Sequence, residues 1–252
     1  MIKLIFDLIC YFDNMCFSGS VNEVLGKLRK KGIAQVGLDA IQPSAFVSGF
    51  SHPLLPITVA ESSDTVTVAQ WGLIPEWVKD AKTGFAISNK TLNARAETLT
   101  ERKMYAPYVA QRCLIYLDGF YEWQHLYGKT YPHYIYSKSS EYICIGGLYT
   151  HSNLVANAAL SCTMITTPAN ELMAKIHNTK LRMPLIIREE DREMWLNGEL
   201  PDAYSLMKPA HNDYLDAHTI KPIRPQSVNP NDPDLKKPFT YPELAVSQGS
   251  LF

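Results

Sequence analysis

Hydrophobic and polar residues alternate over short stretches in the middle of the chain, and this period of two predicts β-strands. Residues 65–71 alternate in this way and are rich in β-branched side chains. Similar strands are expected at residues 113–117, 134–136, 142–148, 162–167 and 185–187. Gly119 and the pair Gly146-Gly147 fall within this region, which indicates bulges or close backbone approaches.

Apolar residues spaced three and four apart predict short helices around these strands. One helix is expected to begin at Ser20, because Ser20 and Glu23 have the spacing of a capping box. Four apolar residues then share one face of that helix: Val21, Val24, Leu25 and Leu28. Further helices are expected at residues 97–104, 171–176 and 189–196, the last ending at Asn197-Gly198. Residues 43–56 are expected to be mostly loop.

Central strands with scattered helices are typical of an α+β protein and not of regular βαβ repeats. We therefore predict a single domain with a curved, largely antiparallel, barrel-like β-sheet core flanked by short helices. Its expected limits are residues 15–232, between an N-terminal extension at 1–14 and an extended C-terminal tail at 233–252. No apolar run is long enough to span a membrane. We predict a cytoplasmic protein and a monomer.

Composition narrows the functional classes. The formal net charge is −1, so any contact with nucleic acid must come from a local basic patch. The five cysteines contain no C-x-x-C pair, so no zinc site is predicted, and no other metal or cofactor is expected. Cys113, Cys144 and Cys162 lie in apolar runs and are expected to be buried, reduced thiols.

The first 14 residues are a poor match to a secretory signal, because one basic residue precedes an apolar run that Asp7 interrupts. Two interpretations remain for this extension. It could form an extra N-terminal strand, or translation could start at Met15. The start at Met15 is preferred, because Cys16 then becomes the second residue of the chain.

Four segments concentrate functional groups without an obvious packing purpose. They are Met15-Cys16, residues 93–98 (NARAET), residues 119–123 (GFYEW) and residues 176–184 (IHNTKLRMP). In the second, Asn93, Arg95 and Glu97 alternate, so an extended segment would project them to one side. Such a face is either solvated or functional, because burying it unpaired is costly.

The third and fourth segments supply candidates for proton transfer. Glu122 lies between aromatic residues, where a carboxyl group suits general acid–base chemistry or pairs with an arginine. His177 follows the helix expected at residues 171–176. Together with Cys16, these residue types allow a cysteine protease. They equally allow chemistry of an N-terminal amine on an aldehyde, and residue types alone do not separate the two.

Five motifs in order resemble the SRAP family (SOS response-associated peptidases, or abasic site processing proteins). They are Met15-Cys16, WGLIPEW, NARAET, GFYEW and H-x(4)-RMP, and the resemblance extends from residue 15 to about residue 229. It implies a SRAP fold and loss of the initiator Met. It also implies that the α-amine and thiol of Cys16 capture the ring-opened sugar of an abasic site in single-stranded DNA. The product is a thiazolidine crosslink that protects the lesion during the DNA damage response.

The resemblance also implies roles for individual residues. Cys16 supplies both nucleophiles, and Asn93 holds its backbone or amine. Glu122 manages protons on the amine and imine. His177 assists sugar ring opening and reversal, a lyase-like step, as a general acid and base.

DNA contacts follow from the same resemblance. Arg95 and Arg182 are expected to hold phosphates beside the lesion, while Trp71 and Trp77 support or stack on bases. The chain departs from the family in three places. Phe17 and Ser18 replace a Gly-Arg pair, and residues 178–181 lengthen the histidine segment. The third departure is the N-terminal extension. Cys16 has a free amine only if this extension is removed or if translation starts at Met15.

Three functional hypotheses remain, together with one predicted partner. The first is abasic site capture, with self-cleavage as the peptidase reaction that exposes Cys16. The others are a thiol peptidase acting on other proteins and a non-catalytic single-stranded DNA-binding module. The C-terminal Gln248, Leu251 and Phe252 resemble peptides that dock on the sliding clamp, which predicts that clamp as a partner and a location at the nucleoid.

Overall fold

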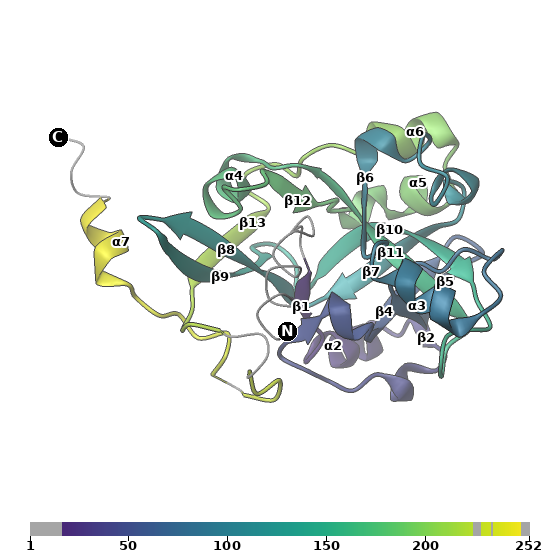
Figure 1. The fold of residues 1–252 in the computed structure, drawn as a ribbon, viewed down its shortest axis with the longest axis horizontal. Coiled ribbons are helices and arrows are strands. Elements are labelled where there is room, and N and C mark those ends of the chain that lie inside the picture. The colour runs from purple at the N-terminus through teal and green to yellow at the C-terminus, as the bar shows by residue number, and fades with distance from the viewer. Residues whose placement is uncertain (1–16, 224–227, 233, 248–252) are drawn as a thin grey trace, which may run out of the picture.

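Two β-sheets form the core of the protein (Figure 1). The computed structural model describes residues 17–223, 228–232 and 234–247. The predicted extension at 1–14, the Met15-Cys16 motif and the clamp-like residues Gln248, Leu251 and Phe252 therefore lie outside the described residues. The predicted α+β class with a curved, mainly antiparallel sheet is confirmed.

The larger sheet closes on itself. Its strand order runs β11-β10-β7-β4-β5, and β5 then pairs with β11 through Cys162 and Trp71. Closure of this kind removes exposed sheet edges, as the predicted barrel-like core requires. The strands concerned are β4 (Leu54–Val59), β5 (Ser62–Trp71), β7 (Arg112–Leu117), β10 (Ile143–His151) and β11 (Leu160–Pro168). Three shorter strands pair at its margins: β2 (Ala34–Gln35), β6 (Asn93–Arg95) and β12 (Arg182–Pro184).

The smaller sheet has the order β13-β9-β8-β1-β3. It contains β1 (Ser18–Ser20), β3 (Val47–Ser48), β8 (Gly119–Leu126), β9 (Lys129–Ser137) and β13 (Leu215–Thr219). A Cβ atom on Gly119 would lie 2.4 Å from the carbonyl oxygen of Ile135, which confirms the predicted close backbone approach. In Figure 1 the β8–β9 hairpin projects away from the closed sheet.

Short helices cover the sheets. They are α2 (Val24–Lys30), α3 (Ala81–Ser88), α4 (Glu171–Ile176), α5 (Arg192–Asn197), α6 (Leu200–Ser205) and α7 (Pro242–Ser247). The chain also forms short 3₁₀ helices: η1 (Leu38–Ala40), η2 (Gly49–Ser51), η3 (Ala96–Thr98), η4 (Ala106–Tyr108) and η5 (Glu189–Asp191). Among the described residues, no helix combines the length and the apolar character needed to cross a bilayer.

Three expected elements differ from the structure. The helix expected at residues 97–104 is wrong: only η3 and turns occur there, because Leu99 is the one fully buried residue and no apolar face exists to stabilise a helix. Residues 43–56 are not all loop, since they contain β3 and the start of β4. The strand expected at residues 185–187 lies instead at β12, and in the expected range only Ile186 forms an isolated bridge, with Ile145.

The predicted capping box is also wrong. Ser20 belongs to β1, and α2 begins only after Glu23, whose side chain caps nothing. Instead, the Asp118 carboxylate accepts hydrogen bonds from Ser20 Oγ at 2.9 Å and from the backbone N–H groups of Asn22 and Glu23 at 2.7 and 3.0 Å. A residue far along the chain thus performs the task that local spacing assigned to Ser20.

Part of the predicted C-terminal tail packs against the second sheet. The backbone N–H of Phe239 donates to Thr219 O at 2.8 Å, and the Tyr241 hydroxyl donates to Ile220 O at 2.9 Å. Glu243, at the start of α7, lies 2.9 Å from Lys129 Nζ on β9. These contacts join the tail to β13 and to the β8–β9 hairpin, beside which α7 is seen in Figure 1.

Candidate functional site

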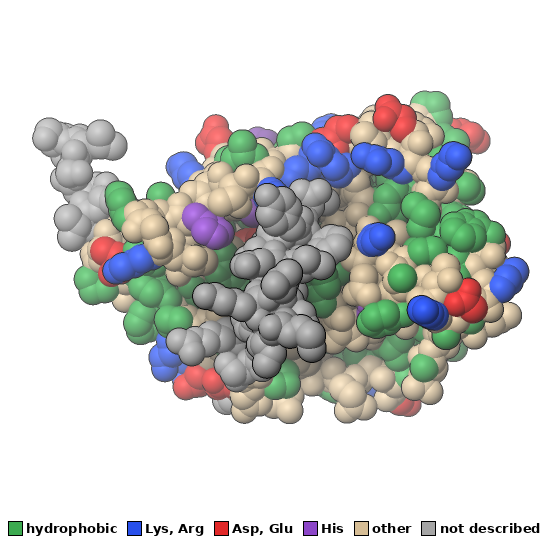
Figure 2. All heavy atoms as spheres, viewed as in Figure 1, with side chains coloured by type: hydrophobic (Ala, Val, Ile, Leu, Met, Phe, Trp, Pro, Cys, Tyr) green, Lys and Arg blue, Asp and Glu red, His purple; other side chains and the backbone are tan. Residues whose placement is uncertain are grey.

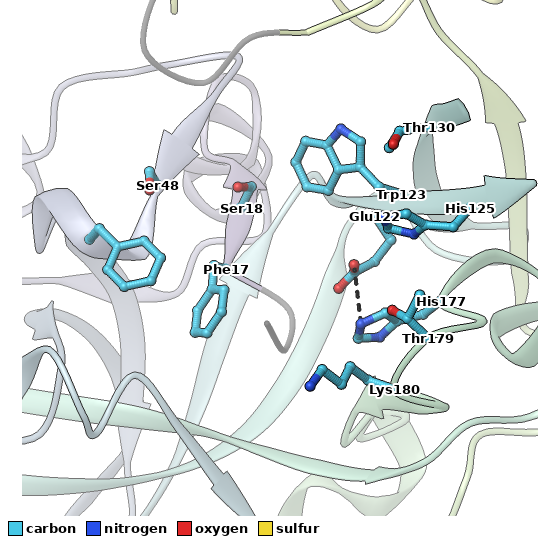
Figure 3. A pocket seen from close by; sticks show the side chains of 11 residues that line it. Phe17, Ser18, Ser48, Glu122, Trp123, His125, Thr130, His177, Thr179 and Lys180 are labelled. Carbon is cyan, nitrogen blue, oxygen red and sulfur yellow. Dashed lines mark ion pairs between the residues drawn. The ribbon is translucent and has the colours of Figure 1, made fainter. Parts of the chain in front are cut away.

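A pocket of about 450 Å³ lies where the start of β1 meets β8 and the segment that follows α4. Figure 3 shows its opposing walls: Phe17 and Ser48 on one side, Glu122, Trp123 and His177 on the other. Phe17 packs against Phe50 with tilted rings whose centroids are 4.8 Å apart, so the first wall is aromatic. The lining residues are Phe17, Ser18, Ser48, Phe50, Glu122, Trp123, His125, Thr130, His177, Thr179 and Lys180.

Glu122 and His177 form a buried pair in this pocket. Glu122 Oε2 lies 3.8 Å from His177 Nε2, and their side chains are only 6% and 4% exposed (Figure 3). The other ring nitrogen, His177 Nδ1, donates to the carbonyl oxygen of Arg182 at 3.0 Å, which leaves Nε2 to face the carboxylate. The pair therefore places a carboxylate and an imidazole nitrogen side by side in the pocket, as general acid–base chemistry requires.

Local structure places both members of the pair. Glu122 follows Tyr121 on β8, and Tyr121 is in register with Ser18 on β1, so the carboxylate lies beside the start of β1. Asn170 caps α4 by accepting from the Met173 N–H at 2.9 Å. The helix ends where the His177 N–H donates to Met173 O at 2.7 Å. The predicted helix at residues 171–176 is thus confirmed, and it delivers His177 to the pocket.

Arg182 lies behind the pocket and does not line it. Its guanidinium is 6% exposed, bonds the Glu97 carboxylate through both terminal nitrogens, and donates to Thr166 O at 2.6 Å. We expected Arg182 to hold a phosphate, but its two terminal nitrogens are instead bonded to protein acceptors in the interior. It instead fixes Glu97 and, through its carbonyl, the orientation of His177.

Asn93 and Trp71 also belong to the interior. Asn93 lies on β6 beside Met164 of β11 and is 8% exposed, and its carbonyl accepts from the Tyr105 hydroxyl at 3.0 Å. Burial raises the pKa of Tyr105 to about 12, so this donor keeps its proton at any physiological pH. Trp71 is 1% exposed and donates to Leu92 O at 2.8 Å, so its ring supports β6 and cannot stack on a base.

Two further candidates, Arg95 and Trp77, are exposed and do not line the pocket. The side chain of Arg95 is 56% exposed and lies 3.9 Å from Glu97, while Trp77 is 57% exposed in the turn after β5. The predicted one-sided Asn/Arg/Glu face is shorter than expected, because β6 ends at Arg95 and η3 follows.

Basic side chains gather on one part of the surface. Arg95, Arg102 and Lys103 are all exposed on the segment that begins at β6. Figure 2 shows Lys and Arg side chains along the upper part of this face, over the region where Figure 1 places β6 and the neighbouring helices. The chain thus carries a local basic surface although its net charge is −1.

The described cysteines are not nucleophiles. Cys113, Cys144 and Cys162 are buried and unpaired by disulfides, as predicted. Burial raises the pKa of Cys144 to about 12, and it raises the pKa values of Cys113 and Cys162 as well, so all three remain thiols near neutral pH. Within the described residues, no cluster of three or more His, Cys, Asp or Glu side chains could hold a metal ion.

Among the residues that line the pocket, sequence reasoning singled out only Glu122 and His177 as site residues. Phe50, Trp123 and Lys180 line the cavity, although none was singled out as a site residue. Trp123 stands within the GFYEW motif, and Lys180 lies in the extra residues of the histidine segment, so both carried a usable signal. Phe50 carried none, because only the fold brings residues 48–50 beside Phe17.

The fold and this pocket define an α+β protein in which Glu122, on the smaller sheet, and His177, after α4, form a buried acid–base pair. Residues 33–224 match the family described as SOS response associated peptidase (SRAP), and the chain therefore belongs to the SRAP family. It is 39% identical over 191 residues to the abasic site processing protein YoqW of Bacillus subtilis (strain 168), covering 73% of this chain and 82% of that protein.

More distant relatives and solved structures agree. The chain is 31% identical over 201 residues to the abasic site processing protein HMCES of Xenopus tropicalis, covering 69% of this chain and 58% of that protein. A crystal structure from Bacteroides thetaiotaomicron superposes with a TM-score of 0.79 at 31% identity, over 89% of this chain and all of that one. A Bordetella bronchiseptica structure, with a TM-score of 0.69 at 22% identity over 82% of this chain and all of that one, shares the fold.

Proposed function

We propose that this protein processes abasic sites in single-stranded DNA by capturing them covalently through Cys16. The observation that carries the proposal is the buried Glu122–His177 pair, which faces Phe17 across the pocket. Phe17 lines the pocket, and Cys16 directly precedes it in the sequence, so we propose Cys16 as the nucleophile of this site. The names of the relatives, all abasic site processing proteins, supply the substrate.

The chemistry balances with the groups at hand. The α-amine of Cys16 adds to the aldehyde of the ring-opened sugar, and loss of one water gives an imine. The thiol sulfur then adds to the imine carbon, and its proton passes to nitrogen, which closes a five-membered thiazolidine. Reference pKa values of about 8 for the amine and about 8.5 for the thiol leave both partly nucleophilic near neutral pH. The second addition is intramolecular and therefore fast.

Glu122 and His177 supply the proton transfers. Sugar ring opening, loss of water and the return of the aldehyde on reversal each move a proton, and a positioned acid–base pair accelerates such steps. His177 is oriented by Arg182 O, and Arg182 by Glu97 and Thr166, so the pair works from a fixed geometry. Asn93 is proposed to hold the Cys16 backbone from β6.

Single-stranded DNA suits the surface around the pocket. A sugar without a base can be splayed out of a single strand into the cavity at little cost. The exposed Arg95 and the basic side chains near β6 offer phosphate contacts, and the exposed Trp77 offers a stacking face. Trp71 and Arg182 serve this function only from the interior, as supports of β6 and of His177.

The proposal requires an active form in which Cys16 is the first residue. Translation from Met15 with loss of that methionine would provide it, and self-cleavage of residues 1–15 is the second route. Self-cleavage is also the only peptidase reaction proposed here. Docking of Gln248, Leu251 and Phe252 on the sliding clamp, a location at the nucleoid and a monomeric state stay predictions.

An oligonucleotide with one abasic site tests the proposal. A chain that begins at Cys16 should form an adduct that survives denaturing electrophoresis, and Cys16→Ala should form none. His177→Gln should slow adduct formation by about 10²-fold, because one positioned acid–base group is worth at least that much. His125→Gln is the matched control, since His125 lines the same pocket without joining the pair.

Two outcomes would contradict the proposal. The first is the absence of any adduct from the chain that begins at Cys16, and the second is an adduct that persists in Cys16→Ala. Turnover of unrelated peptide substrates by a chain whose Cys16 amine is blocked would favour the thiol peptidase instead. Binding of the oligonucleotide without an adduct and without preference for the lesion would favour a plain binding module.

A further inference from the structure

The loop between His177 and Arg182 is held in a defined conformation. The Asn178 side chain accepts from the His125 N–H at 3.0 Å and donates to His125 O at 2.8 Å, which pins the loop to β8. At the other end, the Leu181 N–H donates to His177 O at 2.9 Å, and Leu181 O accepts from the Ala169 N–H at 2.9 Å. Both ends of the loop are therefore anchored by hydrogen bonds.

Leu181 adopts a conformation that such residues avoid. Its φ is +54°, in the left-handed region, where a side chain crowds the backbone. A strained residue persists only where its surroundings enforce it, and such residues concentrate at functional sites. Here the turn at Leu181 closes a loop whose remaining members, Thr179 and Lys180, line the pocket.

Lys180 brings positive charge to that pocket. Among the described residues that line it, Lys180 is the one Lys or Arg. In Figure 3 its side chain extends below His177, toward the space in front of Phe17. The backbone N–H of Lys180 donates to His177 O at 3.3 Å, so Lys180 belongs to the turn that begins at His177.

The two arginines of neighbouring segments do not take this position. Arg182 is buried against Glu97 and Thr166, and Arg95 lies on the solvent side of Glu97. A nucleotide sugar beside Glu122 and His177 would carry a phosphate on each side, close to the Glu122 carboxylate. Without a cation in the pocket, that carboxylate would repel the DNA backbone.

We propose that Lys180 binds a phosphate adjacent to the captured sugar and thereby positions the aldehyde between Cys16 and the Glu122–His177 pair. The inference rests on the proposed function and names a substrate contact for it. An ammonium group suits this role, because it is a compact point charge that can donate hydrogen bonds to phosphate oxygens in many directions. Its binding should depend on salt as phosphate contacts do.

Binding to a fixed abasic analogue tests the inference apart from the covalent step. The probe is a single-stranded oligonucleotide with one tetrahydrofuran residue, which has no aldehyde to react. Lys180→Ala should weaken binding by about fivefold at low salt, in the range of an exposed ion pair. It should also lower the slope of log affinity against log salt by about 0.7, the value for one contact on a single strand.

Two further variants separate charge from other roles. Lys180→Arg should retain most of the affinity, because a guanidinium binds phosphate but forms no imine with an aldehyde. Lys175→Ala is the matched control, since Lys175 is exposed on α4 and does not line the pocket. It should leave both affinity and salt slope near their original values.

An uncharged substitute for one phosphate tests directly whether Lys180 contacts that phosphate. Two probes each replace one phosphate beside the tetrahydrofuran, on the 5′ or the 3′ side, by a methylphosphonate. One of the two should bind the unmodified protein about fivefold more weakly and should cause no further loss in Lys180→Ala. Equal losses for both proteins at both positions would overturn the inference.

The outcomes for Lys180 and for the proposed function are distinguishable. If natural abasic DNA gives no adduct but Lys180→Ala still lowers affinity and salt slope, the covalent function fails and the phosphate contact stands. If the adduct forms and Lys180→Ala matches Lys175→Ala in affinity and slope, the capture of abasic sites stands and the role of Lys180 is overturned.

Discussion

Arg182 and Glu97 illustrate how a charged residue serves a site that it does not touch. The Arg182 guanidinium is 6% exposed and bonded on one side to Glu97 and on the other to Thr166 O. Its backbone carbonyl accepts from His177 Nδ1. Removal of Glu97 would leave a buried guanidinium short of an acceptor, so the residue should affect the stability of the site more than its exposure suggests.

The Arg182 guanidinium lowers the pKa of Glu97 below its ordinary value of 4.5. A carboxyl group with a depressed pKa stabilises the folded state above its ordinary pKa, and that stabilisation is lost as the pH falls through the folded value. Glu97→Gln should therefore lower the free energy of unfolding at pH 7 by about 1 kcal/mol, a modest figure because solvent screens the carboxylate.

The difference between the two proteins should shrink as the pH falls below 4.5. Urea unfolding at pH 7 and at a pH near the lower end of the stable range measures it. Glu101→Gln, at an exposed position nearby, should change the free energy of unfolding by less than about 0.5 kcal/mol at either pH. If Glu97→Gln lowers the free energy of unfolding as much in acid as at pH 7, this account is contradicted.

At the scale of the element, α2 depends on a residue outside itself. The N–H groups of Asn22 and Glu23, which lead into α2, and the Ser20 hydroxyl converge on the Asp118 carboxylate, which is 2% exposed between β7 and β8. Lys27 and Lys236 approach the same carboxylate at 3.8 and 4.0 Å. One buried side chain thus joins the helix, both sheets and the tail.

Asp118→Ala should lower the free energy of unfolding by about 2–3 kcal/mol, because it removes the cap and leaves buried donors without an acceptor. Glu23→Ala, which would remove the capping box suggested by sequence, should cost less than about 1 kcal/mol, since its bonds to Lys27 and Lys236 are surface ion pairs. Urea unfolding of both variants measures the two losses in the free energy of unfolding. Equal losses would contradict this account and favour the capping box that the sequence suggested.

At the scale of the molecule, the described part of the tail closes over the second sheet. The Tyr241 ring lies edge-on to Tyr131 of β9 at 5.0 Å and to Phe239 at 4.9 Å, and its hydroxyl donates to Ile220 O. The hairpin that Tyr131 belongs to also carries Glu122, so the tail stabilises the sheet on which the candidate site is built.

Tyr241→Ala should lower the free energy of unfolding by about 1–2 kcal/mol through loss of its aromatic contacts and hydrogen bond. Lys129→Ala should cost less than about 0.5 kcal/mol, because its bond to Glu243 is exposed to solvent. Thermal or urea unfolding of both variants measures the difference. A tail that contributes nothing to the fold would leave Tyr241→Ala as stable as the unchanged protein.

Much of this protein follows from sequence alone. The strands expected in the middle of the chain became β5, β7, β9, β10 and β11, the helix at residues 171–176 has its expected bounds, and the three cysteines in apolar runs are buried. The ordered motifs identified the SRAP family. These features depend on residues that are close together in the sequence or on short sequence motifs, so they can be recognised in the sequence alone.

Only the tertiary structure decided the rest. Asp118 lies 98 residues from Ser20 in the chain, Glu97 lies 85 residues from Arg182, and β5 meets β11 through Trp71 and Cys162. Whether Arg182 faces a ligand or the interior, and whether Lys180 reaches the pocket, depends on which distant segments pack against them. Contacts between distant segments leave no periodic trace in a sequence, and burial then determines which charged groups remain available to a substrate.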